Sequence, residues 1–521
     1  MISAFIFLPL AVALALVLIP AERVRSIVAI AGAVVTLALG LALWAGGLPV
    51  AERTAWLPSL GVNYSVQLDG PSLLLALVTA FMTVVGLWYA ASRVGVTRRA
   101  GFMAMVLAME TGLLGIFAAR DLILFYAFFE GTLIPSLFLL GRYGREKRMD
   151  AAIKFAVYTV IGGLIMLVAI IGARYLSGSP SFELSDLLAR RLPINDQRWL
   201  LMGFVIAFAI KLPLFPLHAW LPSFHEQNHP SGISDLMGTL YKVGGYGLFR
   251  FALPLFPDAA LELRGWLMLL AAITAVGAAW IAFSQSDWKR LLAYGSLSHM
   301  GLVALGMFSL NPLAMTGALY LLAFQGVYTG ALFLSVGMIE DRVTRHLEAQ
   351  EAAQVAPKPV KVKGGKAQRE AATTREERHA LTIGVVQGMA ESAPALAGVT
   401  LILWFASIGV PGLAGFVGEF SVFIGSYQVA PWLTFIALGA TIGAAAYGLN
   451  AYQKAFQGQP SGGWRVPDVR RREWPILVAT LTVIVLFGVY SGPALNLIQP
   501  AVNATTARFN LPGVTTVQGV R

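Results

Sequence analysis

Apolar stretches of about 20 residues recur along the whole 521-residue chain, and no other feature restricts its fold as strongly. A helix needs about 20 apolar residues to cross the roughly 30 Å hydrocarbon core of a bilayer. The composition agrees, because 57% of the residues are hydrophobic and only 12% are charged, whereas soluble domains carry about 25% charged residues. We therefore predict an all-α, polytopic membrane protein. Its fourteen transmembrane spans are predicted near residues 1–20, 28–46, 71–91, 101–119, 121–140, 153–175, 199–221, 233–256, 263–283, 288–307, 312–338, 392–426, 431–456 and 474–498.

Lysines and arginines concentrate at one end of these predicted helices. The loops that follow the odd-numbered spans hold 26 of the 38 basic residues. Because basic loops remain in the cytoplasm, we predict that this end is cytoplasmic and that both chain termini face the outer side. The net charge of +11 mostly reflects this bias, so it gives no reason to expect a nucleic-acid partner.

Residue types that commonly bind redox cofactors and metals are scarce in this chain. The chain has no cysteine, which excludes thiolate-held iron–sulfur clusters within it. His225 and His229 are the one histidine pair with metal-type spacing, in the polar sequence "HEQNHP", but Pro230 disfavours a helix there. Nucleotide-binding and nucleophile motifs are also missing from the sequence. We therefore predict no metal site and no cofactor in this chain.

Two ionisable side chains lie deep in predicted spans of the first half. A charge at the bilayer centre costs on the order of 3 kcal/mol, so each needs a partner or a purpose. Glu130 lies roughly 13 Å into its helix, counted from Asp121; a structural ion pair is the alternative to a functional role. Lys211 lies roughly 18 Å into its span, and two prolines follow it in "KLPLFP". Snorkelling to a helix end is the alternative for this lysine, but a broken helix beside a charge is how transporters build hydrated sites at mid-membrane.

Lys242 and Glu419 are the corresponding candidates further along the chain. Lys242 lies in "SDLMGTLYKVGGYGLFRF"; burial disfavours its charged form and a nearby carboxylate favours it, so it can gain and lose a proton. A structural ion pair is again the alternative. Glu419 ends "GVPGLAGFVGE", where Pro411 and regularly spaced glycines permit local unwinding and close helix approach. The seventh and twelfth spans are thus both interrupted, and this pattern predicts two inverted repeats, spans 4–8 and 9–13.

Three further polar residues are secondary candidates for a proton path. Glu110 is central in "GFMAMVLAMETGLLGIFAA" but lacks a neighbouring helix break. His218 follows the break in "KLPLFPLHAWLP", and His299 lies in "LLAYGSLSHMGLV". Histidine can relay protons near neutral pH; hydrogen bonds that pack helices together are the alternative for both.

Five motifs carry a resemblance to a known family. "LILFYAFFEGTLIPSLFLLGRYG", "KLPLFPLHAWLP", "YKVGGYGLFRF", "SDWKRLLAYGSLSHMGLVALG" and "GVPGLAGFVGEF" together resemble the antiporter-like subunits of proton-translocating NADH–quinone oxidoreductase, respiratory complex I. The resemblance extends from about residue 70 to residue 460. It is greatest to the subunit M (chain 4) group, in which a glutamate is typical at the position of Glu419.

The resemblance implies fourteen helices with two inverted five-helix repeats and discontinuous seventh and twelfth helices. It assigns proton translocation to Glu130, Lys211, Lys242 and Glu419. It also implies a multi-pass subunit of the bacterial inner (plasma) membrane, with other membrane-arm subunits of complex I on both sides. Flavin, iron–sulfur clusters and quinone would then be held by partner subunits, so this chain would pump protons without a redox centre of its own.

The spans and the resemblance together divide the chain into four parts. Residues 1–100 hold the three N-terminal helices, 101–256 the first repeat, 263–456 the second repeat, and 474–498 the last helix. A cytoplasmic insertion at 347–380 lies within the second repeat. Its charged sequence, interrupted by "PKP" and "GG", predicts a segment that is partly disordered and partly helical; it is a solvated linker or a contact with a soluble partner or the membrane surface.

The sequence departs from the family pattern at two places. Gln325 occupies a position where histidine is common, and glutamine cannot titrate, so a relay between Lys242 and Glu419 would need water or other groups. The loop "LPSFHEQNHPSGIS" lacks the usual acidic residue, which puts a proton-entry role for it in doubt.

Three other functions are compatible with the same sequence. One is a cation/proton antiporter subunit of the multisubunit Na⁺/H⁺ type, which shares most motifs, although Glu419 argues against it. Another is a membrane subunit of a related hydrogenase complex. The third is a non-conducting structural subunit in which the buried charges form locked pairs.

Overall fold

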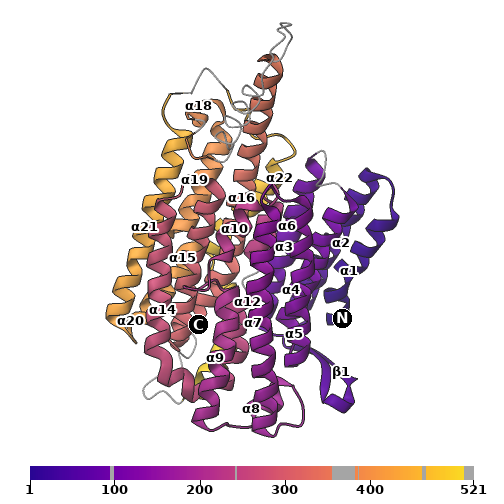
Figure 1. The fold of residues 1–521 in the computed structure, drawn as a ribbon, viewed down its shortest axis with the longest axis vertical. Coiled ribbons are helices and arrows are strands. Elements are labelled where there is room, and N and C mark those ends of the chain that lie inside the picture. The colour runs from indigo at the N-terminus through magenta and orange to yellow at the C-terminus, as the bar shows by residue number, and fades with distance from the viewer. Residues whose placement is uncertain (94–98, 241–242, 355–381, 385–386, 460–464, 510–521) are drawn as a thin grey trace, which may run out of the picture.

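The computed structural model describes all residues except 94–98, 241–242, 355–381, 385–386, 460–464 and 510–521. Its helices run side by side along the long axis of the molecule (Figure 1). Within the described residues, nine helices are long and apolar enough to cross a bilayer, and one further pair qualifies together despite a 67° bend. The first half of the chain contains α1 (Ile2–Leu18), α2 (Glu22–Ala45), α3 (Gly70–Ser92), α4 (Ala100–Ala118), α5 (Leu122–Gly131), α6 (Leu133–Tyr143), α7 (Arg148–Ser177), α8 (Leu184–Leu188), α9 (Ile194–Lys211), α10 (Trp220–Gln227), α11 (Ile233–Leu240), α12 (Val243–Gly247), the π-helical turn η3 (Leu248–Ala252) and α13 (Leu253–Leu255).

The second half continues with long helices and a second interrupted segment. The bent pair is α22 and α23, near the C-terminus. These elements are α14 (Pro257–Phe283), α15 (Trp288–Phe308), α16 (Pro312–Gln354), α18 (Met389–Ser392), α19 (Pro394–Ile408), α20 (Ala414–Tyr427), α21 (Pro431–Phe456), α22 (Trp474–Val489), α23 (Gly492–Thr506) and the short turn η5 (Ala507–Phe509).

The all-α fold class is confirmed, and each of the fourteen expected segments coincides with a helix or a series of helices. Several of these segments are not single helices. The expected span at 233–256 consists of α11, α12, η3 and α13. The breaks expected in the seventh and twelfth spans lie between α9 and α10 and between α19 and α20. The last span is bent between α22 and α23, which was not predicted.

A two-stranded hairpin between α2 and α3 was also not predicted. Strands β1 (Val50–Leu57) and β2 (Val62–Leu68) are antiparallel, with Val50 opposite Leu68, and the turn η1 (Pro58–Leu60) joins them. Three of its apolar side chains, Val62, Val66 and Leu68, are buried, an alternation typical of a half-buried strand. A search for 20-residue apolar stretches cannot detect elements this short. The hairpin lies at the opposite end of the molecule from the end of α16 (Figure 1).

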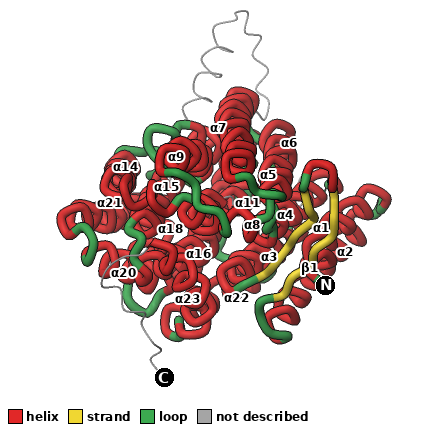
Figure 2. The backbone as a smooth tube through the Cα atoms, turned by 90° about the horizontal axis from the view of Figure 1, so that it is seen from below, coloured by secondary structure: helices red, strands yellow, loops and turns green. Residues whose placement is uncertain are grey.

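The helices differ in how much of their surface the bundle covers. α15 is buried nearly throughout, and so are residues 312–343 of α16, whereas α2 and α7 keep one apolar face exposed. Viewed end-on, α16 lies near the middle of the bundle, α1 and α2 at one side and α21 at the other (Figure 2). Exposed apolar helix faces are expected where lipid replaces water as the solvent. Most polar side chains on α15 and on residues 312–343 of α16 are therefore well shielded from lipid and water.

A buried ion cluster fixes the start of α3 to η3. The Asp69 side chain accepts a hydrogen bond from the backbone N–H of Ser72 and caps α3. Arg250 donates to both Asp69 carboxylate oxygens at 2.7 Å, and Arg120 lies 3.3 Å away. Burial alone raises the pKa of Asp69, but the two guanidinium groups outweigh burial and bring this pKa below its usual range. The cluster is therefore ionised at neutral pH.

We expect Asp69→Asn to destabilise the protein by about 3–5 kcal/mol, because it leaves two buried guanidinium groups without their counter-charge. The measurement is the thermal midpoint for loss of the assembled chain from purified membranes. The matched control is Glu262→Gln, since Glu262 pairs with Arg198 where both side chains are exposed, and such pairs contribute about 0–1 kcal/mol. Equal midpoints for the two variants would contradict the structural importance of the cluster.

Candidate functional site

The first helix break follows from two prolines that lack a backbone N–H. The Ala209 carbonyl of α9 would normally accept from residue 213, which is proline. It accepts instead from Leu214, at 2.7 Å. Because of this shift, the Leu214 N–H does not bind the Ile210 carbonyl. That carbonyl accepts instead a hydrogen bond from the Trp220 indole N–H, at 2.9 Å. The break is thus closed by side-chain and shifted backbone bonds, as an interrupted helix in lipid requires.

Lys211 is the last residue of α9, and only 2% of its surface is exposed. Its ammonium lies 4.8 Å from the ring centroid of Phe129 and 5.6 Å from that of Phe155. Aromatic faces attract cations, and the carboxyl end of a helix also favours a positive charge. Both effects favour the ammonium form at this position, whereas the exclusion of water disfavours it.

Glu130 and Lys211 lie close enough to interact electrostatically. Glu130 is half-buried near the end of α5. Its carboxylate lies against the backbone of α7, so close that a Cβ added at Gly163 would be 1.8 Å from Oε1. Glycine at this position in α7 therefore makes room for the carboxylate.

A cavity of about 10 Å³ lies beside Lys211 and reaches across to α15. Its lining includes His225 of α10 and Ser296 of α15. A volume of this size is about the minimum for one water molecule. The Gln325 amide, on α16, donates to the Ser296 hydroxyl at 3.2 Å, so polar groups continue from the cavity into the middle of the bundle.

The second break again begins with a proline. In a continuous helix the carbonyl of Ser407 in α19 would accept from residue 411, which is a proline without an N–H. His299 of α15 occupies this position instead, because its Nε2 donates to the Ser407 carbonyl at 2.8 Å. The same nitrogen lies 3.4 Å from Oε1 of Glu419, on α20. His299 thus packs the second break and also contacts the acid. Its position is compatible with both the proton-path prediction and the packing alternative.

Glu419 is nearly fully buried, and its other oxygen lies 3.5 Å from the Thr441 hydroxyl of α21. Gly409 adopts a left-handed backbone with φ of +77°, and a Cβ there would be 2.7 Å from the Glu419 Oε2. Glycine therefore serves two purposes at this position: it turns the chain and it admits the carboxylate.

Two of the secondary candidates lie apart from these contacts. Glu110 is completely buried on α4, and in the part of the chain that the structure describes neither carboxylate oxygen has a hydrogen-bond partner. His218 is half-buried in the first break, with its ring 4.2 Å from that of Phe215. Lys242 lies outside the described residues.

Sequence reasoning missed a buried charged cluster beside the cavity. Asp235 of α11 forms an ion pair with Lys289 of α15 at 2.7 Å, and His225 Nδ1 lies 3.0 Å from Asp235. All three side chains are buried. Contrary to the expectation of a loop, His225 lies within α10, while His229 follows the helix. Among the described residues, no group of three or more His, Cys, Asp or Glu side chains is arranged to hold a metal.

Comparison with known proteins identifies the family. Residues 119–357 and 370–443 match the family described as "NADH:quinone oxidoreductase/Mrp antiporter, TM". The chain belongs to this family. It is 44% identical to NADH-quinone oxidoreductase subunit 13 of Thermus thermophilus over 86% of both chains. It is 32% identical to subunit M of Rhodobacter capsulatus over 96% of this chain and 95% of that one.

A solved structure supports the same assignment. A chain of respiratory complex I from Thermus thermophilus with bound NADH has 40% sequence identity and a TM-score of 0.86, and the match covers 98% of this chain and all of the other. The resemblance drawn from the five motifs is therefore confirmed. The chain shares the multi-pass, antiporter-like fold of this family.

We expect Trp220→Phe to destabilise the first break by about 1–3 kcal/mol, because the buried Ile210 carbonyl would lose its donor while the aromatic packing is largely kept. The check is the thermal midpoint of the purified assembly. Trp199→Phe is the matched control, since Trp199 lies on α9, the helix on the other side of the break, and is 82% exposed. If both variants behaved like the unchanged protein, the indole bond would not be what closes the break.

Proposed function

We propose that this chain is a proton-translocating membrane subunit of a bacterial NADH–quinone oxidoreductase. Family membership and the similarity to subunits 13 and M support this proposal. The observation that carries it is the path between two broken helices: Lys211 borders a cavity that reaches α15, and α15 presents His299 to Glu419. A locked structural subunit would not need buried titratable groups at both ends of such a path.

Lys211 and Glu130 act together as the switch in this mechanism. When the Glu130 carboxylate is close, it favours the ammonium form of Lys211. When a charge change in a neighbouring subunit draws Glu130 away, the exclusion of water from Lys211 outweighs the attraction of the aromatic rings and favours the neutral amine, so the lysine releases its proton. Glu130 suits this role because it is only half-buried. The driving force would come from quinone reduction in partner subunits, which hold the flavin and iron–sulfur clusters.

The released proton then passes along α15 to Glu419. The cavity beside Lys211 ends at Ser296, whose hydroxyl can pass a proton and is oriented by Gln325. His299 lies one helical turn further along α15 and contacts Glu419. Gln325 orients rather than titrates on this route, which accounts for a glutamine where relatives often have histidine. Water and Lys242 complete the connection.

The basic end of the bundle is assigned to the cytoplasm of a bacterial inner membrane, and both termini to the outer side. The ion pairs of this end involve arginines from several loops, including Arg93, Arg145 and Arg470. Other membrane-arm subunits are the proposed neighbours. This orientation places the start of α22 and the end of α16 on the cytoplasmic side.

We expect Glu130→Gln and Lys211→Ala, made separately, to reduce proton translocation at least tenfold per assembled complex, because each removes one partner of the switch. The measurement is acidification of inverted membrane vesicles on addition of NADH, divided by the amount of assembled complex. Glu146→Gln and Lys147→Ala are matched controls, since both residues are exposed on a loop.

Full pumping in both switch variants would refute the mechanism. Reduced assembly with unchanged pumping per complex would favour the structural-subunit alternative. Pumping that required sodium would favour a cation/proton antiporter instead, so the assay is run with and without sodium ions.

Two glycines close to Glu419 in sequence allow a test of whether the position of this carboxylate matters. Gly409 and Gly412 both adopt positive φ, +77° and +88°, but only a Cβ at Gly409 meets Glu419. We expect Gly409→Ala and Gly412→Ala to lose similar stability, about 1–2 kcal/mol of backbone strain each. Only Gly409→Ala should also lower proton translocation per assembled complex, by several-fold. Equal pumping by the two variants would show that the position of the Glu419 carboxylate does not matter.

A further inference from the structure

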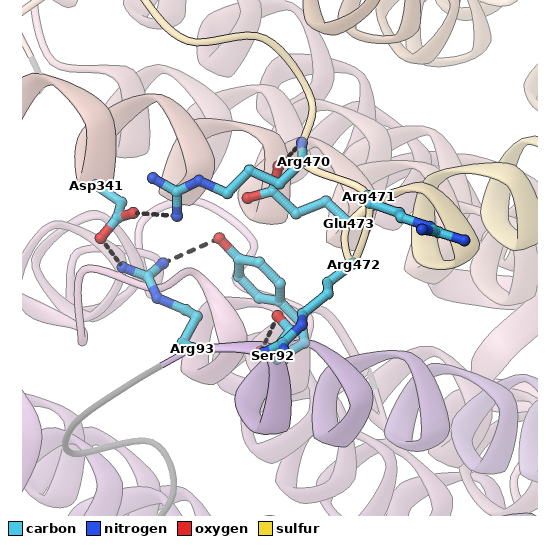
Figure 3. Close-up of a pocket in the computed structure, with 8 residues that line it drawn as sticks. Ser92, Arg93, Asp341, Arg470, Arg471, Arg472 and Glu473 are labelled. Atoms are coloured by element: carbon cyan, nitrogen blue, oxygen red, sulfur yellow. Dashed lines mark hydrogen bonds and ion pairs between the residues drawn. The ribbon is translucent and has the colours of Figure 1, made fainter.

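A cavity of about 330 Å³ lies at the basic end of the bundle, away from the proton path. The end of α3, the middle of α16 and the segment that precedes α22 form its walls (Figure 3). Its lining consists of Tyr89, Ser92, Arg93, Asp341, Arg470, Arg471, Arg472 and Glu473. Such a concentration of arginine beside a helix bundle needs an explanation, because like charges repel.

The positive charge of this cavity is not balanced by its own carboxylates. Four arginines and two acids line it, a net charge of +2. Asp341 already faces three guanidinium groups, those of Arg93 at 2.8 Å, Arg345 at 3.1 Å and Arg470 at 3.3 Å. Glu473 is held by a further arginine, Arg342, at 2.6 Å.

Two lining arginines remain available for a ligand. Within the described residues, Arg471 and Arg472 share no ion pair with a carboxylate, and both are exposed. Arg472 extends across the cavity towards Ser92, while Arg470 extends towards Asp341 (Figure 3). Guanidinium groups bind phosphate oxygens through charge-assisted hydrogen bonds, and the Tyr89 hydroxyl, which accepts from Arg93 at 2.9 Å, keeps its own proton to donate.

The site is held in place by a buried side chain. The side chain of Arg342 has no exposed surface and donates hydrogen bonds to the carbonyls of Pro467, at 2.7 Å, and Asp468, at 3.0 Å. It thereby fixes the segment that carries the three consecutive arginines. Asp468 is engaged elsewhere, since its carboxylate accepts from the N–H groups that begin α19.

The cavity lies at the level where membrane helices end. α3 ends at Ser92 and α22 begins at Trp474, and the exposed tryptophans Trp88 and Trp474 flank the lining residues in sequence. Tryptophan is enriched at the membrane–water interface. Below Trp474, the exposed face of α22 continues with Val478, Val485 and Val489, which is a surface suited to acyl chains.

We propose that this cavity binds the phosphate headgroup of an anionic phospholipid, whose acyl chains lie along the exposed face of α22. The excess positive charge selects the anionic headgroup, and the adjoining apolar face selects a lipid over free phosphate. Its placement in the cytoplasmic leaflet rests on the proposed orientation, but the binding itself does not depend on proton translocation.

The test uses the complete complex, purified in mild detergent and incubated with a photoactivatable phosphatidylglycerol. After illumination, mass spectrometry locates labelled peptides and quantifies those from the first turns of α22. We expect labelling there to fall by about 30-fold in the double variant Arg471→Gln/Arg472→Gln, equivalent to about 2 kcal/mol for two basic residues at a membrane surface. The matched control is Arg142→Gln/Lys147→Gln, which removes two exposed charges at the same end, one from the last turn of α6 and one from the loop after it, and should leave labelling unchanged.

Competition identifies the source of the phosphate. Unlabelled phosphatidylglycerol should displace the probe, whereas phosphatidylcholine and inorganic phosphate at the same concentration should not. Displacement by inorganic phosphate as effective as that by phosphatidylglycerol would overturn the proposal in favour of a soluble anion. Equal labelling of the two double variants, or the absence of label on α22 in the unchanged complex, would overturn it as well.

Discussion

In a bilayer, each backbone hydrogen-bonding group must find a partner inside the protein, and this requirement determines where helices of this chain can be interrupted. Both central breaks begin where a proline removes a donor. The carbonyl left by the first is bound by the indole of Trp220, and the carbonyl left by the second by the imidazole of His299. A break on the lipid-facing surface could not be repaired in this way, so both are confined to the interior. The same confinement removes water from Lys211 and Glu419 and makes their charges sensitive to their neighbours.

α15 connects the two breaks because it is the buried helix that contacts both. Ser296 borders the cavity beside Lys211, and His299, one turn later, bonds to the second break and contacts Glu419. Lys289, at the start of the same helix, pairs with the buried Asp235. One helix thus carries polar side chains at three levels of the bundle, each paired with a different helix. A shift of α15 would alter the surroundings of all three, which gives the two halves of the chain a physical means of influencing each other.

Much of this could be predicted from the sequence because the strongest signals are local. Long apolar stretches predicted fourteen helical segments, and proline near a buried charge predicted both breaks. Other features depend on contacts between distant residues. The Asp235–Lys289 pair joins residues 54 positions apart, and the spacing of neither residue indicates a partner. From the sequence, Gln325 was notable only because histidine is common at its position. Its hydrogen bond to Ser296 depends on the packing of α15 against α16. The hairpin β1–β2 and the bend between α22 and α23 were missed because short or bent elements give a weak hydropathy signal.

The two candidate carboxylates, Glu130 and Glu419, are positioned in the same way, although the helices around them differ. Each lies against a glycine on another backbone segment, Glu130 against Gly163 and Glu419 against Gly409. A buried carboxylate needs room close to the main chain, and a Cβ at either glycine would occupy it. The consequences differ, because Glu130 is only partly buried, whereas Glu419 is almost fully buried between His299 and Thr441. In the mechanism that we propose, Glu130 responds to charges outside the chain and Glu419 to changes within it. That mechanism uses the difference to give the path a direction: the less buried acid senses the neighbouring subunit, and the more buried acid receives the proton that the lysine releases.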